Sequence, residues 1–145
     1  MKNSILDKKP VLYGLIVLCV ILLFISYMQQ KTRKQMKEVA KLPFYDVSVD
    51  EVPDGTYEGE TFTSFMHVKL LVTVQNHQIM DIQVLENEGS RGQHVEPILK
   101  RMIQENKSVV PAEKGEEIAS IVFISCVDDA LSKAISKPLE NSSKL

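Results

Sequence analysis

Apolar and polar residues alternate in two neighbouring stretches near the middle of the chain. Every second position in residues 67–75 is apolar, which puts four side chains on one face of a strand: Val68, Leu70, Val72 and Val74. Residues 79–85 repeat the pattern, with Met80, Ile82 and Val84 on one face. Because a short polar segment, residues 76–78, joins the two stretches, they are predicted to form an antiparallel hairpin. A shorter strand is expected before them, over residues 54–60.

Helical spacing replaces this alternation in the second half of the chain. Apolar residues in the stretch 93–106 recur at intervals of 3, 1, 3 and 1, which predicts an amphipathic helix. The same stripe returns in a last helix, at Val127, Ala130, Leu131, Ala134 and Ile135. Residues 117–126, EIASIVFISC, are predicted as a buried strand before that helix, with Ser125 and Asp128 forming a capping box. Two helices packed on an antiparallel sheet, with residues 109–110 as a further short strand, define an α+β domain.

The N-terminal part of the chain contains an uncharged apolar run, residues 11–28. The run is long enough to cross a bilayer as one transmembrane helix. A cleaved signal peptide is the alternative, but the residues that follow, QQKTRKQM, contain no small-x-small cleavage site. We therefore expect an uncleaved, single-pass anchor in the lipid bilayer of the cell membrane. The expected organisation is a basic flank (1–10), the transmembrane helix, a basic stalk (29–52), a folded domain (53–137) and a disordered tail (138–145).

The net charge of −2 hides an asymmetry between the two parts of the chain. Up to Lys41 there are eight Lys or Arg and two Asp or Glu, a net charge of +6, whereas the remainder carries −8. An acidic domain argues against nucleic-acid binding, which needs a positive face. The basic stalk suits a membrane surface with anionic lipids. By the positive-inside rule, the charges after the helix place its C-terminal side in the cytoplasm.

Residues that commonly carry chemistry are scattered along the chain. His67, His77 and His94 lack metal-ligand spacing, so we expect ordinary surface roles for them and no metal site. No Ser-His-Asp order or nucleophile elbow is present, and no catalytic residue is predicted. Glu58 and Glu60 share one face of a strand, and a solvated edge is favoured there over an acid–base pair.

The segment Gly89-Ser90-Arg91-Gly92 lies at the start of the first predicted helix. It combines flexible backbone amides, a hydroxyl and a guanidinium with a helix N-terminus, a set that suits a phosphate group. A Gly-rich strand-to-helix connection with a solvated Arg is an equally good interpretation. The residues alone do not separate the two.

Residues 54–93, DGTYEGETFTSFMHVKLLVTVQNHQIMDIQVLENEGSRGQ, resemble the opening of the small FMN-binding domain family. The predicted helices EPILKRMIQENKSV and DDALSKAI continue the resemblance to about residue 136. Such domains recur in membrane-attached electron carriers, including flavin-carrying subunits of sodium-pumping quinone reductase. The resemblance implies an FMN-binding electron-transfer module with a redox partner protein rather than a self-contained enzyme. It also implies an extracytoplasmic domain, against the positive-inside count.

In this family an extended run ends in Ser-Gly-Ala-Thr-x-Ser or Thr before a helix, and the Thr can carry FMN through a phosphoester. Residues 120–125 here read SIVFIS, so Ile121 stands at the Gly and Phe123 at the acceptor Thr. Because Phe123 has no hydroxyl, covalent attachment is not expected. The resemblance then implies non-covalent FMN, held by Thr61, Thr63, Met66, Gly89, Ser90, Arg91, Gly92, Ser120 and Ser125. The alternatives are a flavin-free domain acting as a scaffold or regulatory module, and a non-functional copy.

Overall fold

The computed structural model describes residues 8–89 and 91–136. The chain divides into two compact units, residues 1–37 and 38–145. Helix α1, Lys8–Val39, is the one helix among the described residues that is long and apolar enough to cross a membrane. Its apolar window has a mean hydropathy of 2.7, and none of that window is buried. A single N-terminal helix of this kind fits either a membrane span or a signal sequence.

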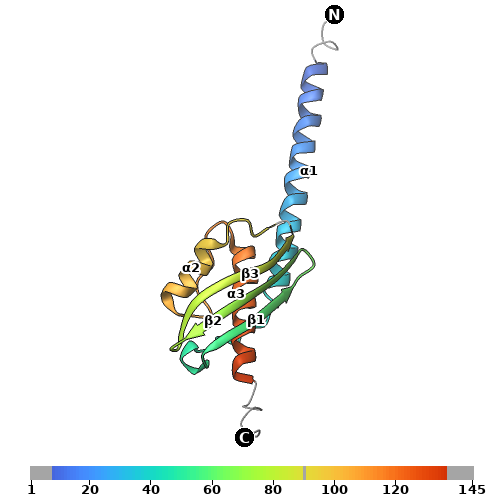
Figure 1. Cartoon of the computed structure of the whole chain (residues 1–145). Coiled ribbons are helices and arrows are strands. Elements are labelled where there is room, and N and C mark those ends of the chain that lie inside the picture. The colour runs from blue at the N-terminus through green and yellow to red at the C-terminus, as the bar shows by residue number, and fades with distance from the viewer. Residues whose placement is uncertain (1–7, 90, 137–145) are drawn as a thin grey trace, which may run out of the picture. The chain divides into compact units, whose positions relative to one another are not determined.

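Three antiparallel strands form the sheet, in the order β1-β2-β3 (Figure 1). They are β1 (Gly55–Phe62), β2 (Met66–Gln75) and β3 (Gln78–Gly89). The predicted hairpin is confirmed: β2 and β3 are joined by a turn in which Asn76 and His77 have φ of 53° and 60°. Positive φ at both central residues is the geometry that matches the twist of two-residue hairpins. The predicted α+β class is confirmed as well, with helices packed beside an antiparallel sheet.

The predicted faces of β3 need a correction. Met80 is 53% exposed, whereas Ile79 and Ile82 are buried. The register explains the difference, because Ile79 pairs with Val74 but Asp81 pairs with Thr73, so Met80 is an extra residue. Such a bulge shifts the side-chain alternation by one position. The expectation that Met80 shares a buried face with Ile82 is therefore wrong.

Helix α2, Glu96–Glu105, is shorter than the predicted stretch 93–106. It ends at Asn106, which has a left-handed backbone with φ of 52°. The Asn106 side chain joins the helix end to the β2–β3 hairpin: its Oδ1 accepts a hydrogen bond from the Ile79 N–H at 2.9 Å, and its Nδ2 donates to the His77 carbonyl at 3.0 Å. The described residues 109 and 110 are not part of a strand, so that expectation is wrong.

Helix α3, Glu117–Ser136, contains the whole of EIASIVFISC. The predicted strand over 117–126 is therefore wrong, and so is the capping box, because Ser125 and Asp128 lie in the middle of the helix. Thirteen of the 20 residues of α3 are buried, including residues on every side of its first half. A helix that is buried all round loses the polar stripe by which an amphipathic helix is recognised.

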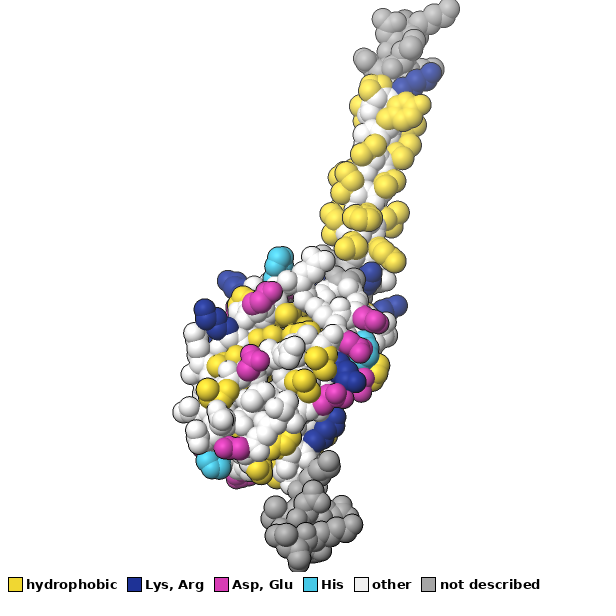
Figure 2. Space-filling view, viewed as in Figure 1, with side chains coloured by type: hydrophobic (Ala, Val, Ile, Leu, Met, Phe, Trp, Pro, Cys, Tyr) yellow, Lys and Arg dark blue, Asp and Glu magenta, His cyan; other side chains and the backbone are white. Residues whose placement is uncertain are grey.

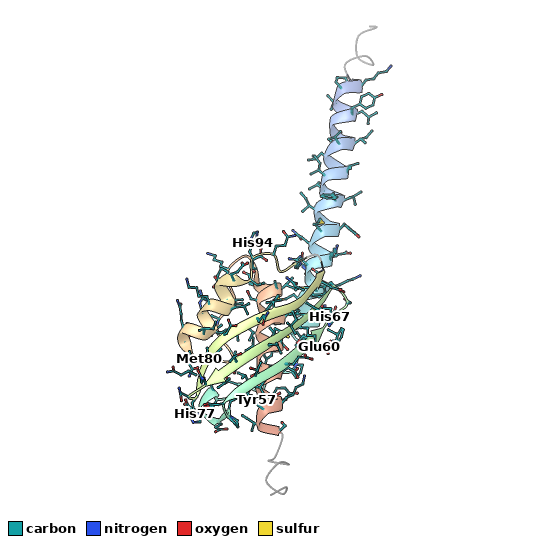
Figure 3. The ribbon with its side chains drawn as sticks, in the orientation of Figure 1. Tyr57, Glu60, His67, His77, Met80 and His94 are labelled. Atoms are coloured by element: carbon teal, nitrogen blue, oxygen red, sulfur yellow. The ribbon has the colours of Figure 1, made fainter. Side chains whose placement is uncertain are left out.

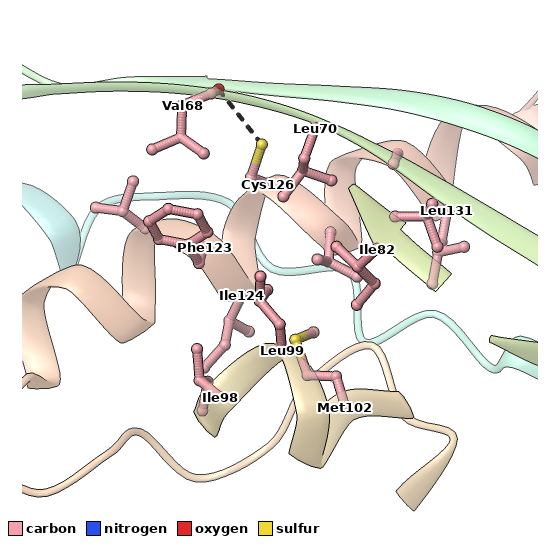
Figure 4. Close-up of a cluster of buried hydrophobic side chains, with 14 of the residues drawn as sticks. Val68, Leu70, Ile82, Ile98, Leu99, Met102, Phe123, Ile124, Cys126 and Leu131 are labelled. Carbon is pink, nitrogen blue, oxygen red and sulfur yellow. Dashed lines mark hydrogen bonds between the residues drawn. The ribbon is translucent and has the colours of Figure 1, made fainter. Parts of the chain in front are cut away.

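The core lies between one face of the sheet and the two domain helices. In Figure 1, α3 crosses behind β1 and β2 while α2 lies beside β3, and α3 packs mainly against β1 and β2. Figure 4 shows Phe123 and Ile124 of α3 among side chains from the sheet and from α2. The segment before the sheet contributes Val49, from the 3₁₀ turn η1 (Val49–Glu51), and Val52. The expected tail, 138–145, lies outside the described residues.

Candidate functional site

Four of the residues predicted to hold FMN meet at the end of the sheet where β1 passes into β2. Thr63 closes the turn between these strands: its hydroxyl donates to the Met66 carbonyl at 2.9 Å and accepts from the Met66 N–H at 2.8 Å. Met66 is 2% exposed and lies opposite Gly89 in the ladder. Gly92 follows, and a Cβ there would lie 3.0 Å from the Met66 methyl carbon. The structure thus gathers Thr63, Met66, Gly89 and Gly92 at one place.

The loop after β3 is held closely over the side chain of Phe123. Gly89 and Gly92 have φ of 136° and 94°, backbone conformations that favour glycine. Asn87 Nδ2 donates to the Gly92 carbonyl at 2.7 Å, and a Cβ on Gly92 would lie 3.2 Å from the Phe123 ring. Arg91 is half-buried, and Ser90 lies outside the described residues. The aromatic ring therefore occupies the space directly beneath this loop.

The three remaining predicted residues use their hydroxyls inside the fold. Ser120 is 2% exposed, and its Oγ accepts a hydrogen bond from the Glu113 N–H at 3.1 Å. Ser125 is 3% exposed, and its Oγ donates to the Pro43 carbonyl at 3.5 Å. Thr61 lies on β1 and is buried, and its side chain is hydrogen-bonded to Cys126.

The backbone amides around Phe123 are also used inside the fold, in the hydrogen bonds of α3. The Ser120 N–H donates to the Glu116 carbonyl at 2.9 Å, which begins the hydrogen-bond ladder of α3. Amides in the interior of a helix donate to the carbonyl four residues earlier, so those of Val122 and Phe123 are already used. Phe123 is fully buried, and Ile121 is half-buried against the core. These positions form an internal helix rather than a turn open to a phosphate.

Asp128 is a buried charge whose role the sequence patterns missed. It is completely buried, and its carboxylate accepts hydrogen bonds from two backbone N–H groups, those of Tyr45 and Val47. The contact fastens the segment before the sheet onto the middle of α3. The sequence signal for this role is an acidic residue next to the apolar stripe of the last helix. A carboxylate buried there needs hydrogen-bond donors, which backbone N–H groups can supply.

Cys126 lies one turn from Phe123 and faces the sheet. Its thiol donates to the Val68 carbonyl at 3.4 Å (Figure 4). Burial raises the pKa of the Cys126 thiol from its ordinary 9.0 to about 12, and the hydrogen bond from Thr61 opposes that shift only in part. The neutral thiol is therefore a packing group at physiological pH, and not a nucleophile.

The outer face of the sheet carries charged side chains in contact with one another. His67 stacks on Phe62 with ring centroids 4.0 Å apart, and its Nε2 lies 2.9 Å from Glu60 Oε1. Its Nδ1 lies 3.6 Å from Glu86 Oε2. Figure 3 shows His67 and Glu60 side by side on β2 and β1, and Figure 2 shows acidic and basic side chains interspersed over this face. Within the described ranges, no group of three or more His, Cys, Asp or Glu could hold a metal ion.

Glu58 shares this outer face with Glu60, as expected from their spacing on the strand. Its Oε1 lies 3.2 Å from Lys69 Nζ on β2. The other two histidines lie elsewhere: His77 in the β2–β3 turn and His94 in the segment before α2 (Figure 3). The outer face is therefore a solvated, mainly acidic surface, with its histidine and its lysine each held by a carboxylate.

A groove of about 620 Å³ runs between the free edge of β1 and the last turns of α3. Its walls are Thr56, Tyr57, Glu58, Lys133, Ala134 and Ser136. Farther along the same edge, Asp129 Oδ2 accepts a hydrogen bond from the Glu60 N–H at 3.1 Å and lies 2.6 Å from Lys133 Nζ. Among the residues that the structure describes, the strand edge is thus covered by a carboxylate at Glu60 and open at Thr56 and Glu58.

Comparison of the chain with protein-family models, with curated protein sequences and with solved structures gives no match.

Proposed function

We propose that this protein is a membrane-tethered relative of the small FMN-binding domains that carries no covalent flavin and acts as a protein-binding module. The absence of covalent flavin is carried by the position of Phe123, which is fully buried in the interior of α3. A phosphoester needs an accessible hydroxyl, and the motif position offers a packed aromatic ring in its place. The binding role is supported by the groove beside the edge of β1, where Thr56 and Glu58 lie beyond the carboxylate cover at Glu60.

The neighbouring hydroxyls give no substitute for the missing acceptor. Ser120 and Ser125 are both buried, and both are hydrogen-bonded to groups of the domain itself. Flavin transfer to either would require α3 to unpack from the sheet. Because α3 supplies a large part of the core, such unpacking amounts to unfolding the domain.

Non-covalent FMN is the second candidate, with an electron-transfer role and a redox partner at the cell membrane. It is favoured by the loop 89–92, which contains two glycines with positive φ and precedes α2 by the three residues 93–95. Backbone amides at such a place suit a phosphate. The ring of Phe123 beneath Gly92 argues for a surface position of any bound phosphate, over the loop rather than within the core.

A flavin assay on the full chain in detergent micelles separates these possibilities. The chain is expressed with a flavin transferase, and the denatured protein band is checked for flavin fluorescence. The native protein is then titrated with FMN. We expect no flavin fluorescence on the denatured protein band and no uptake of FMN by the native protein.

Arg91→Gln tests the second candidate, non-covalent binding of FMN at the loop 89–92. FMN that dissociates on denaturation and binds more weakly to Arg91→Gln would establish non-covalent binding at the loop. Fluorescence that stays on the denatured band would overturn the argument from Phe123. Lys100→Gln, on the exposed side of α2, is a matched change of charge outside the loop.

Anchoring in the cell membrane, with the domain on the extracytoplasmic side, is part of the same proposal. It is supported by the length and hydropathy of α1 and, for the side of the membrane, by the resemblance. Protease added to intact cells should remove the domain and leave the anchor. A protected domain would favour the opposite orientation, which the basic stalk indicates.

A further inference from the structure

The free edge of β1 has a regular geometry, which shows where its unpaired backbone groups point. β1 is an edge strand, because within residues 8–89 and 91–136 it pairs with β2 alone. Its ladder with β2 is regular from Gly55 to Phe62. In a regular antiparallel ladder, alternate residues direct their N–H and C=O groups away from the partner strand.

The Glu60 N–H shows which residues these are. It points away from β2, because it donates to Asp129 on α3. By alternation, the backbone groups of Thr56 and Glu58 point the same way. These two residues line the open groove, and the carboxylate cover ends at Glu60. The groove therefore presents an uncovered stretch of strand edge above a helix.

An edge strand beside a helix is the arrangement in which an extended peptide can be added as a further strand. The peptide would exchange main-chain hydrogen bonds with Thr56 and Glu58. Its alternate side chains would point to opposite faces of the sheet. One set would enter the groove over Ala134, beside Tyr57, and the other set would lie next to Glu58 and Glu60 on the outer face.

Charge indicates the chemistry of that peptide. Residues 42–66, which lead into and include β1, contain six Asp or Glu and no Lys, Arg or His. Glu58 and its neighbours Asp54 and Glu51 are exposed. A second copy of β1 would place these acidic side chains opposite one another, which destabilises a strand pair. A segment with Lys or Arg at alternate positions would instead be attracted to them.

We propose that the β1 edge and its groove bind an extended, basic segment of a partner protein as a fourth, antiparallel strand. This inference rests on the proposed function as a binding module, for which it names the surface and the chemistry of the partner. The recognition is by backbone hydrogen bonds along Thr56–Glu58 and by ion pairs to the carboxylates of Glu58 and Glu60, each of which also contacts one side chain of β2, Lys69 and His67 respectively. Lys133 lines the groove and pairs with Asp129, so apolar or acidic side chains of the peptide are favoured beside it.

The test uses the full chain in micelles and a labelled peptide in which Lys and Val alternate, with fluorescence anisotropy as the readout. Two matched peptides accompany it: one with the same residues in blocks, and one N-methylated at alternate residues. The proposal expects binding that weakens with added salt, and at least about tenfold weaker binding of the N-methylated peptide, because its hydrogen bonds are lost. Equal binding of all three peptides would overturn it, since charge alone would then explain the attraction.

Two variants of the chain locate the site. Thr56→Pro removes an outward N–H that the β1–β2 ladder does not use, and an edge strand tolerates Pro at such a position. It should weaken binding by about tenfold or more. Glu58→Gln should weaken binding and flatten the salt dependence, whereas Glu88→Gln, on β3, is the matched control and should leave both unchanged. Unchanged binding to Thr56→Pro and Glu58→Gln would overturn the proposal.

Two other occupants of the groove would be recognised in the same experiment. If removal of residues 138–145 strengthens peptide binding, the chain's own tail competes for the edge, and the partner assignment is wrong. If the chain self-associates in sedimentation and Thr56→Pro abolishes this, the occupant is a second copy. The flavin assay reports on the proposed function independently, because the β1 edge and the loop 89–92 share no residue.

Discussion

Replacing Phe123 with Thr, the residue that the flavin-binding motif would have there, tests directly how this segment is built. The ring is fully buried and lies under the loop at Gly92. Removing a buried Phe ring from a core costs about 3–5 kcal/mol in the free energy of unfolding, from lost burial and the cavity that remains. The new hydroxyl can bond to the carbonyl four residues earlier in the helix, so we expect a net loss of about 4 kcal/mol.

That loss is a large fraction of the free energy of unfolding of a domain of this size, which is roughly 5–15 kcal/mol. Pulse proteolysis in urea measures it on the full chain in micelles, because cleavage reports the unfolded fraction of the domain. With a urea dependence of about 2 kcal/mol per M, the midpoint should fall by about 2 M.

Ile121→Thr is the matched control, because Ile121 is on the same helix but only half-buried. Its midpoint should fall by less than about 1 M, since less apolar surface is lost. An equal or smaller effect of Phe123→Thr would show that the ring is not in the core. The assignment of residues 117–126 to a buried helix would then be wrong.

Three further predictions follow from other contacts of α3. Asp128→Ala leaves the N–H groups of Tyr45 and Val47 without their acceptor, and should lower the free energy of unfolding by about 3 kcal/mol in the same urea assay; an effect near zero would contradict the role of Asp128. Gly59→Ala places a Cβ 2.0 Å from the Cys126 carbonyl oxygen, so β1 must move away from α3, and little soluble folded protein is expected; a normally stable variant would show that the strand and helix are farther apart. In the folded state the pKa of the Cys126 thiol is raised from 9.0 to about 12, so folding favours the protonated thiol. The stability that the protonated thiol contributes is fully present below pH 9.0 and is lost as the pH rises toward 12. Wild-type protein should therefore lose stability relative to Cys126→Ala over that range, by up to about 1.4 kcal/mol per pH unit, and parallel curves would contradict this.

The strands were predicted well because their alternation is a local property of the chain. Residues 67–75 have one buried face, and the structure buries the four apolar side chains that define it. The faces of β3 could not be predicted in full, because the bulge at Met80 depends on the register with β2. A one-residue shift of register leaves no trace in the sequence of a single strand.

The segment 117–126 was misassigned for a different reason. Four consecutive apolar residues fit a buried strand as well as a buried helix, and only the packing of α3 beneath the sheet separates the two. The same packing explains why Gly59 is small and why Asp128 can be buried: one allows the close approach of β1, and the other bonds to the segment before the sheet. These are contacts between residues far apart in sequence, which no local pattern contains.

Some of the predicted FMN-binding residues lie together at one end of the sheet, and others are buried inside the fold. Thr63, Met66, Gly89 and Gly92 lie together where β1 passes into β2. Ser120 and Ser125 are instead used inside the fold, because their helix is internal. Binding of FMN itself stays a prediction.

The flavin content of the full chain after expression with a flavin transferase decides whether residues 120–125 can carry FMN. We predict no fluorescence on the denatured protein band, because the acceptor position holds a buried ring, and no FMN uptake by the native protein in micelles, because the Phe123 ring fills the space beneath Gly92. Covalent flavin on the denatured band, mapped by mass spectrometry to a peptide of residues 117–126, would contradict it.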